Sequence, residues 1–263
     1  MKIVFLGDIV GPKGIDVASK HLLKIKQDYS PDLIIANIEN SAPKGRGISE
    51  DCVKKLTSAG CHVFTGGNHS FARKESYAIY QQNKNVIRPI NFPNGVPGNG
   101  YYVYENLSGD KVVVINVQLR VYMRECLGCP FKAIESVIQL FKNENPIIFI
   151  DVHGEATSEK ISFGIYFDGM VSAIVGTHTH VQTADERILP KGSAYITDVG
   201  MTGALNSSLG VKASATIYNF INQLPSTFEL EEDGDFISNG VLIEVENKTK
   251  KAISIKRLSE LYK

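Results

Sequence analysis

Residues 175–180 read "VGTHTH", so that an apolar run ends in two histidines one residue apart. In an extended backbone, residues i and i+2 project to the same face. We therefore expect His178 and His180 to point together, toward water, toward each other or toward a shared ion. The surrounding chain decides among these, because the same pattern of a short apolar run with a polar end occurs four more times.

The four other apolar runs predict buried strands, because each is short and stops at glycine or a polar residue. They are "KIVFLG" (2–7), "DLIIANIEN" (32–40), "CHVFTGGNHS" (61–70) and "PIIFIDVHG" (146–154). Segments 13–28 and 49–58 have the mixed pattern of surface helices. Strands that alternate with helices indicate an α/β fold with central parallel pairing.

The rest of the chain predicts a second set of elements. "GYYVYEN" and "KVVVINVQ" flank Ser-Gly-Asp and predict a hairpin. Helices are expected at 130–143 and 211–223, and strands at 100–106, 111–118, 193–200, 226–232, 239–246 and 250–257. No repeat or long linker interrupts the sequence, so we expect one domain over residues 1–263 with two sheets.

The composition argues against several classes of partner. Lys plus Arg equals Asp plus Glu at 28 each in a chain of 263 residues. This balance gives no electrostatic footprint for specific nucleic-acid binding or for an anionic membrane, although it allows a small anionic substrate. The beginning, "MKIVFLGDIVGPKG", lacks the apolar core of a signal peptide. We therefore expect a cytoplasmic protein with no membrane partner, and a homo-oligomer remains compatible with the sequence.

The polar ends of the five strands suggest a shared metal cluster. In open α/β sheets, ligands bind outside the carboxyl ends of strands. Imidazole and carboxylate groups suit zinc, manganese and iron. The set is larger than one tetrahedral site needs and fits two ions about 3.5–4 Å apart. The candidate ligands are Asp8, Glu39, Asn40, Asn68, His153, His178 and His180, with His69 as the natural non-ligand acid.

Each of these residues also has a simpler interpretation when taken alone. Asp8 could be a turn or cap residue, and the histidine pair could lie in a solvated loop. Gly66–Gly67 could form a tight turn with positive φ. The occurrence of five such strand ends in one chain favours the metal cluster over five separate explanations.

Two further motifs have no clear place in this cluster. Cys126-x-x-Cys129 could be half of a zinc site or a redox pair, but no second pair with similar spacing exists among the four cysteines. "PKGRG" (43–47) follows Glu39 and Asn40 and could help to hold a phosphate, although such loops are usually only solvated.

Two other histidine motifs do not match. Metallo-β-lactamase-like hydrolases carry His-x-His-x-Asp-His, whereas "HTHVQTAD" has no Asp at the matching place. Amidohydrolase barrels place His-x-His at the end of their first strand, whereas here it follows residue 170.

The order of motifs resembles that of the calcineurin-like metallophosphoesterases and is most similar to the YmdB-like subfamily of bacterial phosphodiesterases. The resemblance runs from residue 1 to about residue 225. It is carried by "GDIVG" (7–11), "NIEN" (37–40), "GGNHS" (66–70), "DVHGEATSEK" (151–160), "VGTHTHVQTADERILPKG" (175–192) and "ITDVGMTG" (196–203).

The resemblance implies a metallophosphoesterase-type α/β sandwich of two mixed β-sheets flanked by helices (α/β/β/α). Two metal ions are implied at one edge, iron or manganese, with zinc as the alternative. Matching positions assign Asp8, Glu39, Asn40 and His180 to one ion, Glu39, Asn68, His153 and His178 to the other, and His69 to the proton donor.

The implied activity is hydrolysis of small phosphodiesters by a metal-bound hydroxide. The expected substrates are 2′,3′-cyclic nucleotides, and 3′,5′-cyclic nucleotides are also open. A phosphomonoesterase or nucleotidase, or a metal-containing regulatory protein with little turnover, are the alternatives. Two places depart from the subfamily pattern: Ser70-Phe71-Ala72 stands in place of Thr-Trp-Asp, and Cys126 and Cys129 stand where proline and acidic residues are common. Both departures could lie near the substrate.

Overall fold

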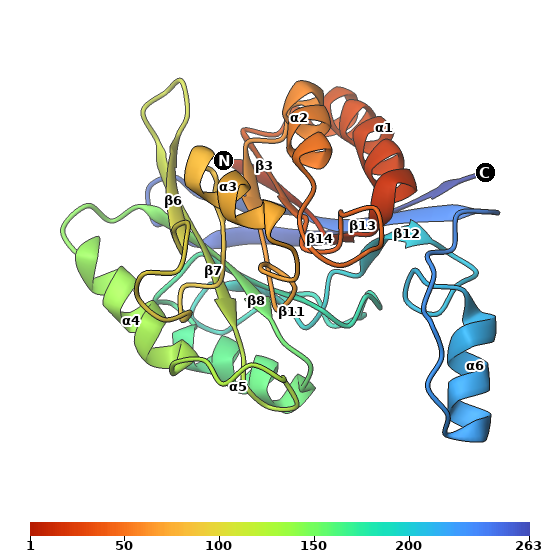
Figure 1. The fold of residues 1–263 in the computed structure, drawn as a ribbon. Coiled ribbons are helices and arrows are strands. Elements are labelled where there is room, and N and C mark those ends of the chain that lie inside the picture. Colours follow the sequence, from red (N-terminus) through yellow and green to blue (C-terminus); the bar gives the residue numbers. More distant parts are fainter.

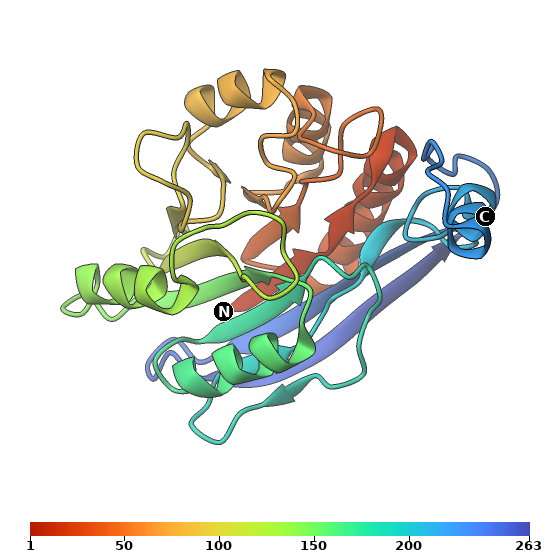
Figure 2. The ribbon, with the colours of Figure 1, turned by 60° about the horizontal axis from the view of Figure 1, so that its bottom comes forward.

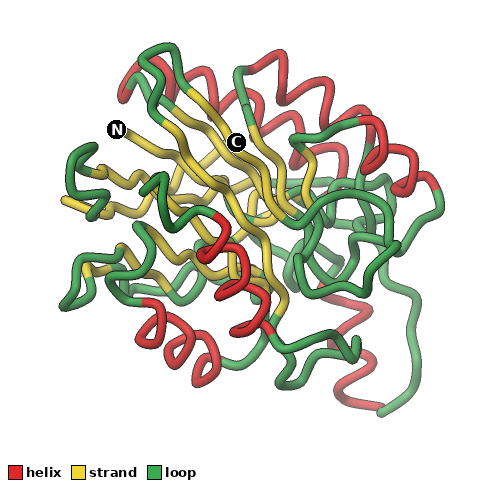
Figure 3. The backbone as a smooth tube through the Cα atoms, turned by 90° about the vertical axis from the view of Figure 1, so that its left-hand side faces the viewer, coloured by secondary structure: helices red, strands yellow, loops and turns green.

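Strand β1 (Lys2–Leu6) shows how the chain forms layers. Its buried side chains alternate, as the period of two in a strand requires. Val4 and Leu6 pack into an apolar cluster beneath helices, and Ile3 and Phe5 pack against the other sheet. In the computed structural model, which describes residues 1–263, two sheets lie between two layers of helices (Figure 1; Figure 3).

The first sheet combines the beginning and the end of the chain. Its central strands run parallel in the order β1-β3-β4-β5, and β13 pairs antiparallel with β1. The sheet continues through β12 to β2, and β14 pairs with β13. The remaining strands are β2 (Asp8–Ile9), β3 (Leu33–Asn37), β4 (Val63–Thr65), β5 (Val86–Ile87), β12 (Met201–Ala204), β13 (Phe236–Val245) and β14 (Ala252–Tyr262).

The second sheet is built from the middle of the chain in the order β10-β11-β9-β8-β7-β6. Its four inner strands are parallel, and both edge strands are antiparallel to their neighbours. The strands are β6 (Tyr101–Glu105), β7 (Lys111–Gln118), β8 (Ile147–His153), β9 (Ala173–Thr177), β10 (Arg187–Ile188) and β11 (Ala194–Ile196). Both sheets are therefore mixed.

Five of the six helices cover the outer faces of the sheets. Helices α1 (Gly11–Tyr29), α2 (Glu50–Ala59) and α3 (Glu75–Gln82) pack on the first sheet. Helices α4 (Pro130–Leu140) and α5 (Thr157–Phe167) pack on the second. Helix α6 (Ala213–Asn222) buries none of its residues and projects from one end of the molecule (Figure 1; Figure 2).

Several elements differ from the sequence prediction. Helices α3 and α5 and the short strands β5, β10 and β12 were not predicted. The strand predicted at 226–232 is wrong, because only Leu230 forms a bridge, to Val211. The strands predicted at 32–40 and 61–70 end at Asn37 and Thr65, so the polar residues after them lie in loops. None of the six helices has both the length and the apolar composition of a membrane span.

Candidate metal centre

The carboxyl ends of five parallel strands meet at one rim between the two sheets. Strands β1, β3 and β4 contribute from the first sheet, and β8 and β9 contribute from the second. Parallel strands in the same orientation place the loops after them on one side. The structure brings all eight predicted site residues to this rim: Asp8, Glu39, Asn40, Asn68, His69, His153, His178 and His180.

Four side chains converge in the middle of the rim. His153 Nε2 lies 3.2 Å from Glu39 Oε1 and 2.9 Å from Asn68 Oδ1. His178 Nδ1 lies 3.1 Å from the same His153 nitrogen. The possible ligand atoms of Glu39, His153 and His178 all lie within 4.8 Å of one another. One carboxylate, one amide oxygen and two imidazole nitrogens therefore form a compact donor group.

Asn40, His69 and His180 lie beside this group. Asn40 Nδ2 donates to Glu39 Oε1 at 3.2 Å and lies 3.1 Å from His180 Nε2. His69 Nδ1 lies 3.0 Å from Asn40 Oδ1 and 3.3 Å from Glu39 Oε1. The backbone N–H of His69 also donates to Glu39 Oε2 at 2.9 Å. Glu39 thus contacts both halves of the predicted ligand set, as a bridging carboxylate would.

Asp8 has a free, buried oxygen at the same rim. Its Oδ2 accepts a hydrogen bond from the backbone N–H of His178 at 3.1 Å. Its Oδ1 is buried and has no hydrogen-bond partner. Buried polar atoms are nearly always paired, so an unpaired carboxylate oxygen points to a ligand such as a cation.

The donor group fits metal ions in both chemistry and spacing. Two neighbouring donor atoms that bind one ion with bonds of about 2.1 Å lie about 3 Å apart. The donor atoms of Glu39, Asn68 and His178 lie 2.9–3.2 Å from His153 Nε2. Mixed oxygen and imidazole donors suit first-row transition metals.

Gly67 shows how closely the chain passes this group. A Cβ on Gly67 would lie 2.3 Å from Glu39 Oε2 and 2.4 Å from His153 Nε2. Neither Gly66 nor Gly67 has a positive φ, so the tight turn considered from the sequence is not the reason for the glycines. Gly67 is required by close approach to the candidate ligands instead.

Burial and neighbouring charges shift the pKa values of three groups at the rim. Burial disfavours charge on Glu39, but His153 and His69 hold its pKa well below its usual value. Burial also favours the neutral ring of His153, but the nearby Glu39 carboxylate outweighs it and raises the pKa of His153 to about 9. Burial and repulsion from His153 lower the pKa of His178 to about 3. A metal ion would have to displace the proton from His153, because only a deprotonated nitrogen binds metal.

A buried chain of hydrogen bonds orients His153. His153 Nδ1 lies 2.9 Å from Thr177 Oγ1, and this hydroxyl donates to Asp151 Oδ1 at 2.7 Å. Thr65 donates to the other Asp151 oxygen at 2.5 Å. Burial raises the pKa of Asp151 to about 6. The chain directs His153 Nε2 to the centre, as carboxylates behind metal-binding histidines do. Asp151 was not among the predicted site residues, although it stands two residues before His153 on the same strand and shares its face.

His178 and His180 reach the centre on a strained loop and not on a strand. Strand β9 ends at Thr177, and His178 and His180 have φ values of 101° and 66°. The extended geometry expected for the pair is therefore wrong, although both rings arrive at the rim. Non-glycine residues seldom have positive φ, and such strain clusters at functional sites.

A buried ion pair supports this loop. Lys160 Nζ of α5 lies 2.9 Å from Asp198 Oδ2 and donates to the Thr177 carbonyl at 2.7 Å. The same Asp198 oxygen accepts from the backbone N–H of Thr179 at 3.0 Å. Neither residue was identified from the sequence, because their contact joins segments 38 residues apart.

Two contacts made by the loop histidines were also missed. His178 Nε2 lies 3.0 Å from Glu155 Oε2, and Glu155 is exposed. His180 Nδ1 lies 3.0 Å from the carbonyl oxygen of Leu209. These contacts fix which ring nitrogen of each histidine faces the rim.

A cavity of about 740 Å³ opens onto the rim. Its walls include His69, His178 and His180, and also Lys44 and Arg46 of the "PKGRG" loop. The residues at the two departures from the subfamily pattern do not line this cavity. Phe71 packs against the rings of Tyr77, Tyr80 and Phe92, and segment 120–131 contributes no lining residue. All four cysteines are free, so no disulfide links Cys126 to Cys129.

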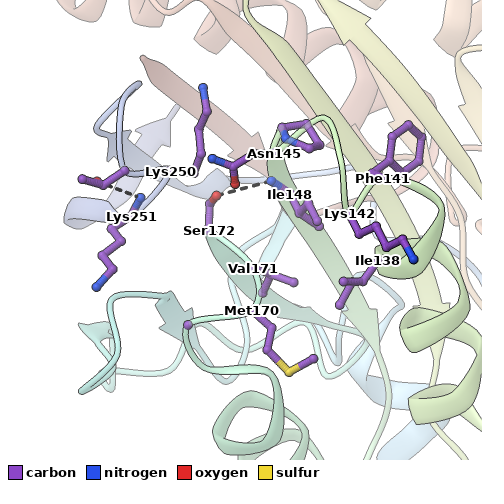
Figure 4. Close-up of a pocket in the computed structure, with 13 residues that line it drawn as sticks. Ile138, Phe141, Lys142, Asn145, Ile148, Met170, Val171, Ser172, Lys250 and Lys251 are labelled. Carbon is purple, nitrogen blue, oxygen red and sulfur yellow. Dashed lines mark hydrogen bonds between the residues drawn. The ribbon is translucent and has the colours of Figure 1, made fainter.

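A second, smaller cavity of about 140 Å³ lies at the other end of the second sheet (Figure 4). It is lined by Ile148, near the beginning of β8, and by Val171 and Ser172, which precede β9. The Ser172 hydroxyl accepts a hydrogen bond from the Ile148 backbone N–H at 3.3 Å. It contains none of the candidate ligands, so the chemistry belongs to the larger cavity.

The chain is similar to known proteins over nearly its whole length. The family model described as "YmdB-like protein" matches residues 4–258. A Bacillus subtilis (strain 168) protein named 2′,3′-cyclic-nucleotide 2′-phosphodiesterase is 44% identical over 258 residues, which are 98% of this chain and 96% of that protein.

Two solved structures have the same fold. A Mycoplasma pneumoniae protein described as a novel phosphatase superposes with a TM-score of 0.92 at 35% identity, over 99% of this chain and 93% of that one. A hypothetical protein from Thermus thermophilus superposes with a TM-score of 0.90 at 34% identity, over 99% of both chains. The predicted metallophosphoesterase-type sandwich is confirmed by these structures and by the two mixed sheets.

Proposed function

This chain belongs to the YmdB-like protein family and is a phosphoester hydrolase, and from this premise we propose that it is a metal-dependent phosphodiesterase for small diesters. The preferred substrates are 2′,3′-cyclic nucleotides, the class named for the Bacillus subtilis relative. The proposal also includes hydrolysis of 3′,5′-cyclic nucleotides, with a lower kcat/KM. The observation that carries the proposal is the donor group of Glu39, Asn68, His153 and His178 beside an open cavity.

Two ions, iron or manganese with zinc as the alternative, are assigned to this donor group and its neighbours. Asp8, Glu39, Asn40 and His180 would hold one ion, and Glu39, Asn68, His153 and His178 would hold the other. Bound ions of this kind lower the pKa of a water to near 7 and balance charge on a phosphate. Residues 1–263 act as one catalytic domain in this proposal.

His69 is the proton donor to the leaving alkoxide. Its Nδ1 is held by Asn40 and Glu39, at 3.0 Å and 3.3 Å. Its Nε2 has no hydrogen bond within the protein, and the side chain lines the cavity. A histidine that is anchored through one nitrogen and free at the other can transfer a proton at a fixed place, because geometry and pKa both count in general acid catalysis.

A phosphomonoesterase is the second candidate. The Mycoplasma pneumoniae structure, which covers 99% of this chain, is described as a phosphatase. A monoester carries two charges on its phosphate, so it would depend more strongly on the cations of Lys44 and Arg46 at the cavity wall.

A substrate panel with defined metal content tests the proposal. Protein stripped of metal is reloaded with manganese, iron or zinc and offered 2′,3′-cyclic nucleotides, 3′,5′-cyclic nucleotides and nucleoside monophosphates. We expect two ions per chain and the highest kcat/KM on the 2′,3′-cyclic class. Higher kcat/KM on monoesters would favour the phosphatase, and full metal loading without turnover on any substrate would favour a regulatory protein.

A variant of one candidate ligand, measured in the same panel, tests where the ions bind. His153→Ala should lower the metal content, because His153 has its Nε2 among three other donors. Full occupancy of both ions in His153→Ala would refute its assignment as a ligand.

A further inference from the structure

One wall of the cavity comes from a segment outside the catalytic motifs, residues 208–230, which we call the strap. Its two ends are joined by backbone hydrogen bonds from Lys212 to Glu229 at 2.9 Å and from Glu231 to Gly210 at 3.0 Å. Helix α6 lies between these ends and stands away from the body (Figure 1; Figure 2). The strap also contacts the rim, because the Leu209 carbonyl lies 3.0 Å from His180 Nδ1.

Leu230 packs closely against the beginning of α1 and against the "PKGRG" loop. A Cβ on Gly11 would lie 2.4 Å from Leu230 Cδ1, and a Cβ on Gly45 would lie 2.6 Å from Leu230 Cδ2. Gly11 follows the strand that begins with Asp8, and Gly45 lies in the "PKGRG" loop. Both glycines have positive φ, and at each the space that a Cβ would need is filled by the Leu230 side chain. Leu230 therefore holds the strap in a fixed position relative to the candidate metal centre.

Two phenylalanines of the strap face the cavity with much of their surface exposed. Phe220 is 74% exposed and Phe228 is 44% exposed. Both line the same cavity as His69, His178 and His180. Exposed aromatic rings beside a catalytic group form an unfilled apolar surface, which a ligand stabilises by covering it.

The size of the cavity and the residues that line it narrow the choice of ligand. Its volume of about 740 Å³ is that of pockets for small organic molecules, and a phosphate group alone would leave most of it empty. Its lining combines Glu39, His69 and His178 of the rim with the aromatic rings of the strap. A ligand with a phosphodiester at one end and a flat aromatic group at the other matches both.

We propose that Phe220 and Phe228 form a stacking platform for the base of a nucleotide whose phosphodiester lies beside His69. The platform rests on the proposed function and adds to it the group that the enzyme recognises. Base–aromatic stacking tolerates any base, because every base has a π-face. The platform therefore distinguishes nucleotides from base-free phosphodiesters and discriminates little among the bases.

A pair of substrates that differ only in the base tests the platform. One is a nucleoside 2′,3′-cyclic phosphate, and the other is methyl riboside 2,3-cyclic phosphate, which has the same reacting group and no base. Phe220→Ala and Phe228→Ala should each raise KM for the nucleotide about 10-fold, from the usual strength of base stacking, with kcat nearly unchanged. Neither change should affect the base-free diester.

Tyr218→Ala is the matched control. Tyr218 lies on the same helix and is 47% exposed, but it does not line this cavity. Its replacement should leave both substrates unaffected. Equal losses on both substrates in Phe220→Ala, or a change in its assembly state, would assign Phe220 to a structural or subunit contact and overturn the platform.

A binding measurement separates the platform from the reaction. The chain has no tryptophan, so Phe220→Trp introduces a single selective fluorophore. A nucleoside 2′-monophosphate should quench this fluorescence, ribose phosphate should not, and Tyr218→Trp should respond to neither. Quenching by the nucleotide in a protein that hydrolyses no diester would refute the proposed function and keep the base site. Hydrolysis without quenching would refute the platform alone.

Discussion

At the scale of single residues, His178 and His180 show that a local sequence pattern can identify candidate ligands while distant contacts place them. The backbone at both positions has positive φ, and the Asp8 carboxylate accepts from the His178 N–H. The sequence pattern identified the two imidazoles, whereas the turn that aims them depends on Asp8, 170 residues away. The cost of this strain is of order 1–3 kcal/mol per residue and must be offset by the surrounding contacts.

His69 gives the sharpest prediction at this scale. His69→Ala should lower kcat on nucleotide diesters by about 10²–10⁴-fold, because a poor leaving group needs its proton. A diester with a p-nitrophenyl leaving group should lose much less, since that group departs without protonation. Metal content, measured by elemental analysis, should stay at the wild-type level. Loss of metal in His69→Ala would make His69 a ligand.

At the scale of elements, α5 matters because it carries Lys160. Lys160 is buried against Asp198, and together they hold the backbone at Thr177 and Thr179. This helix was not predicted from the sequence, and it contains a glycine, Gly164. In the structure a Cβ at Gly164 would lie 2.5 Å from the ring of Tyr195, so the glycine makes room for that ring.

Lys160→Met should destabilise the protein by about 3–5 kcal/mol in urea unfolding, because it leaves the Asp198 charge buried and unpaired. It should also weaken metal binding, since the loop of His178 and His180 loses a support. Lys160→Met combined with Asp198→Asn should recover stability and leave metal binding weak. Lys132→Met, which removes the exposed ion pair with Glu135, should leave the unfolding midpoint nearly unchanged. Wild-type metal affinity in Lys160→Met would rule out the supporting role.

Helix α1 docks on the first sheet partly through a buried histidine. His21 Nδ1 lies 2.8 Å from Ser238 Oγ of β13, and burial lowers the pKa of His21 to about 4. The unfolded chain has the ordinary value of about 6.5 and so binds the proton more readily. The free energy of unfolding should therefore fall as the pH drops from about 6.5 to about 4, by on the order of 3 kcal/mol from this group.

His21→Gln removes the titration and should flatten that part of the stability curve. The measurement is urea unfolding across this pH range, read as a difference in slope between variant and wild type. A constant offset between the two curves, with equal slopes, would mean that His21 titrates normally in the folded protein.

At the scale of the whole molecule, the candidate metal centre joins the two sheets. Glu39 and Asn68 follow strands of the first sheet, whereas His153 and His178 follow or end strands of the second. Ions held by both sheets stabilise the folded state only, by about 2.7 kcal/mol when free metal is 100 times the Kd. Removing metal with a chelator should therefore lower Tm, and adding metal back should restore it. His153→Ala should show a much smaller change, and equal shifts in both proteins would place the stabilising metal elsewhere.

The fold and the candidate site could be predicted from the sequence where the pattern involves residues close together in the chain. Each apolar run and its polar end lie within a few residues, so the main strands could be predicted together with the eight residues that the structure brings to the rim. Residues 226–232 alternate like a strand but find no partner beyond Val211, which a local pattern cannot show. The pairing of Lys160 with Asp198 and the wall formed by Phe220 depend on contacts between distant segments.

The position of the strap allows substrate binding to change separately from the candidate metal centre. It meets the rim through Leu230 and a few backbone contacts, and none of the predicted metal ligands lies within it. Substitutions within α6, which buries none of its residues, could accumulate without moving Leu209 or the candidate ligands at the rim. Changes in α6 could then alter which substrates bind, while the residues of the candidate metal centre stay the same.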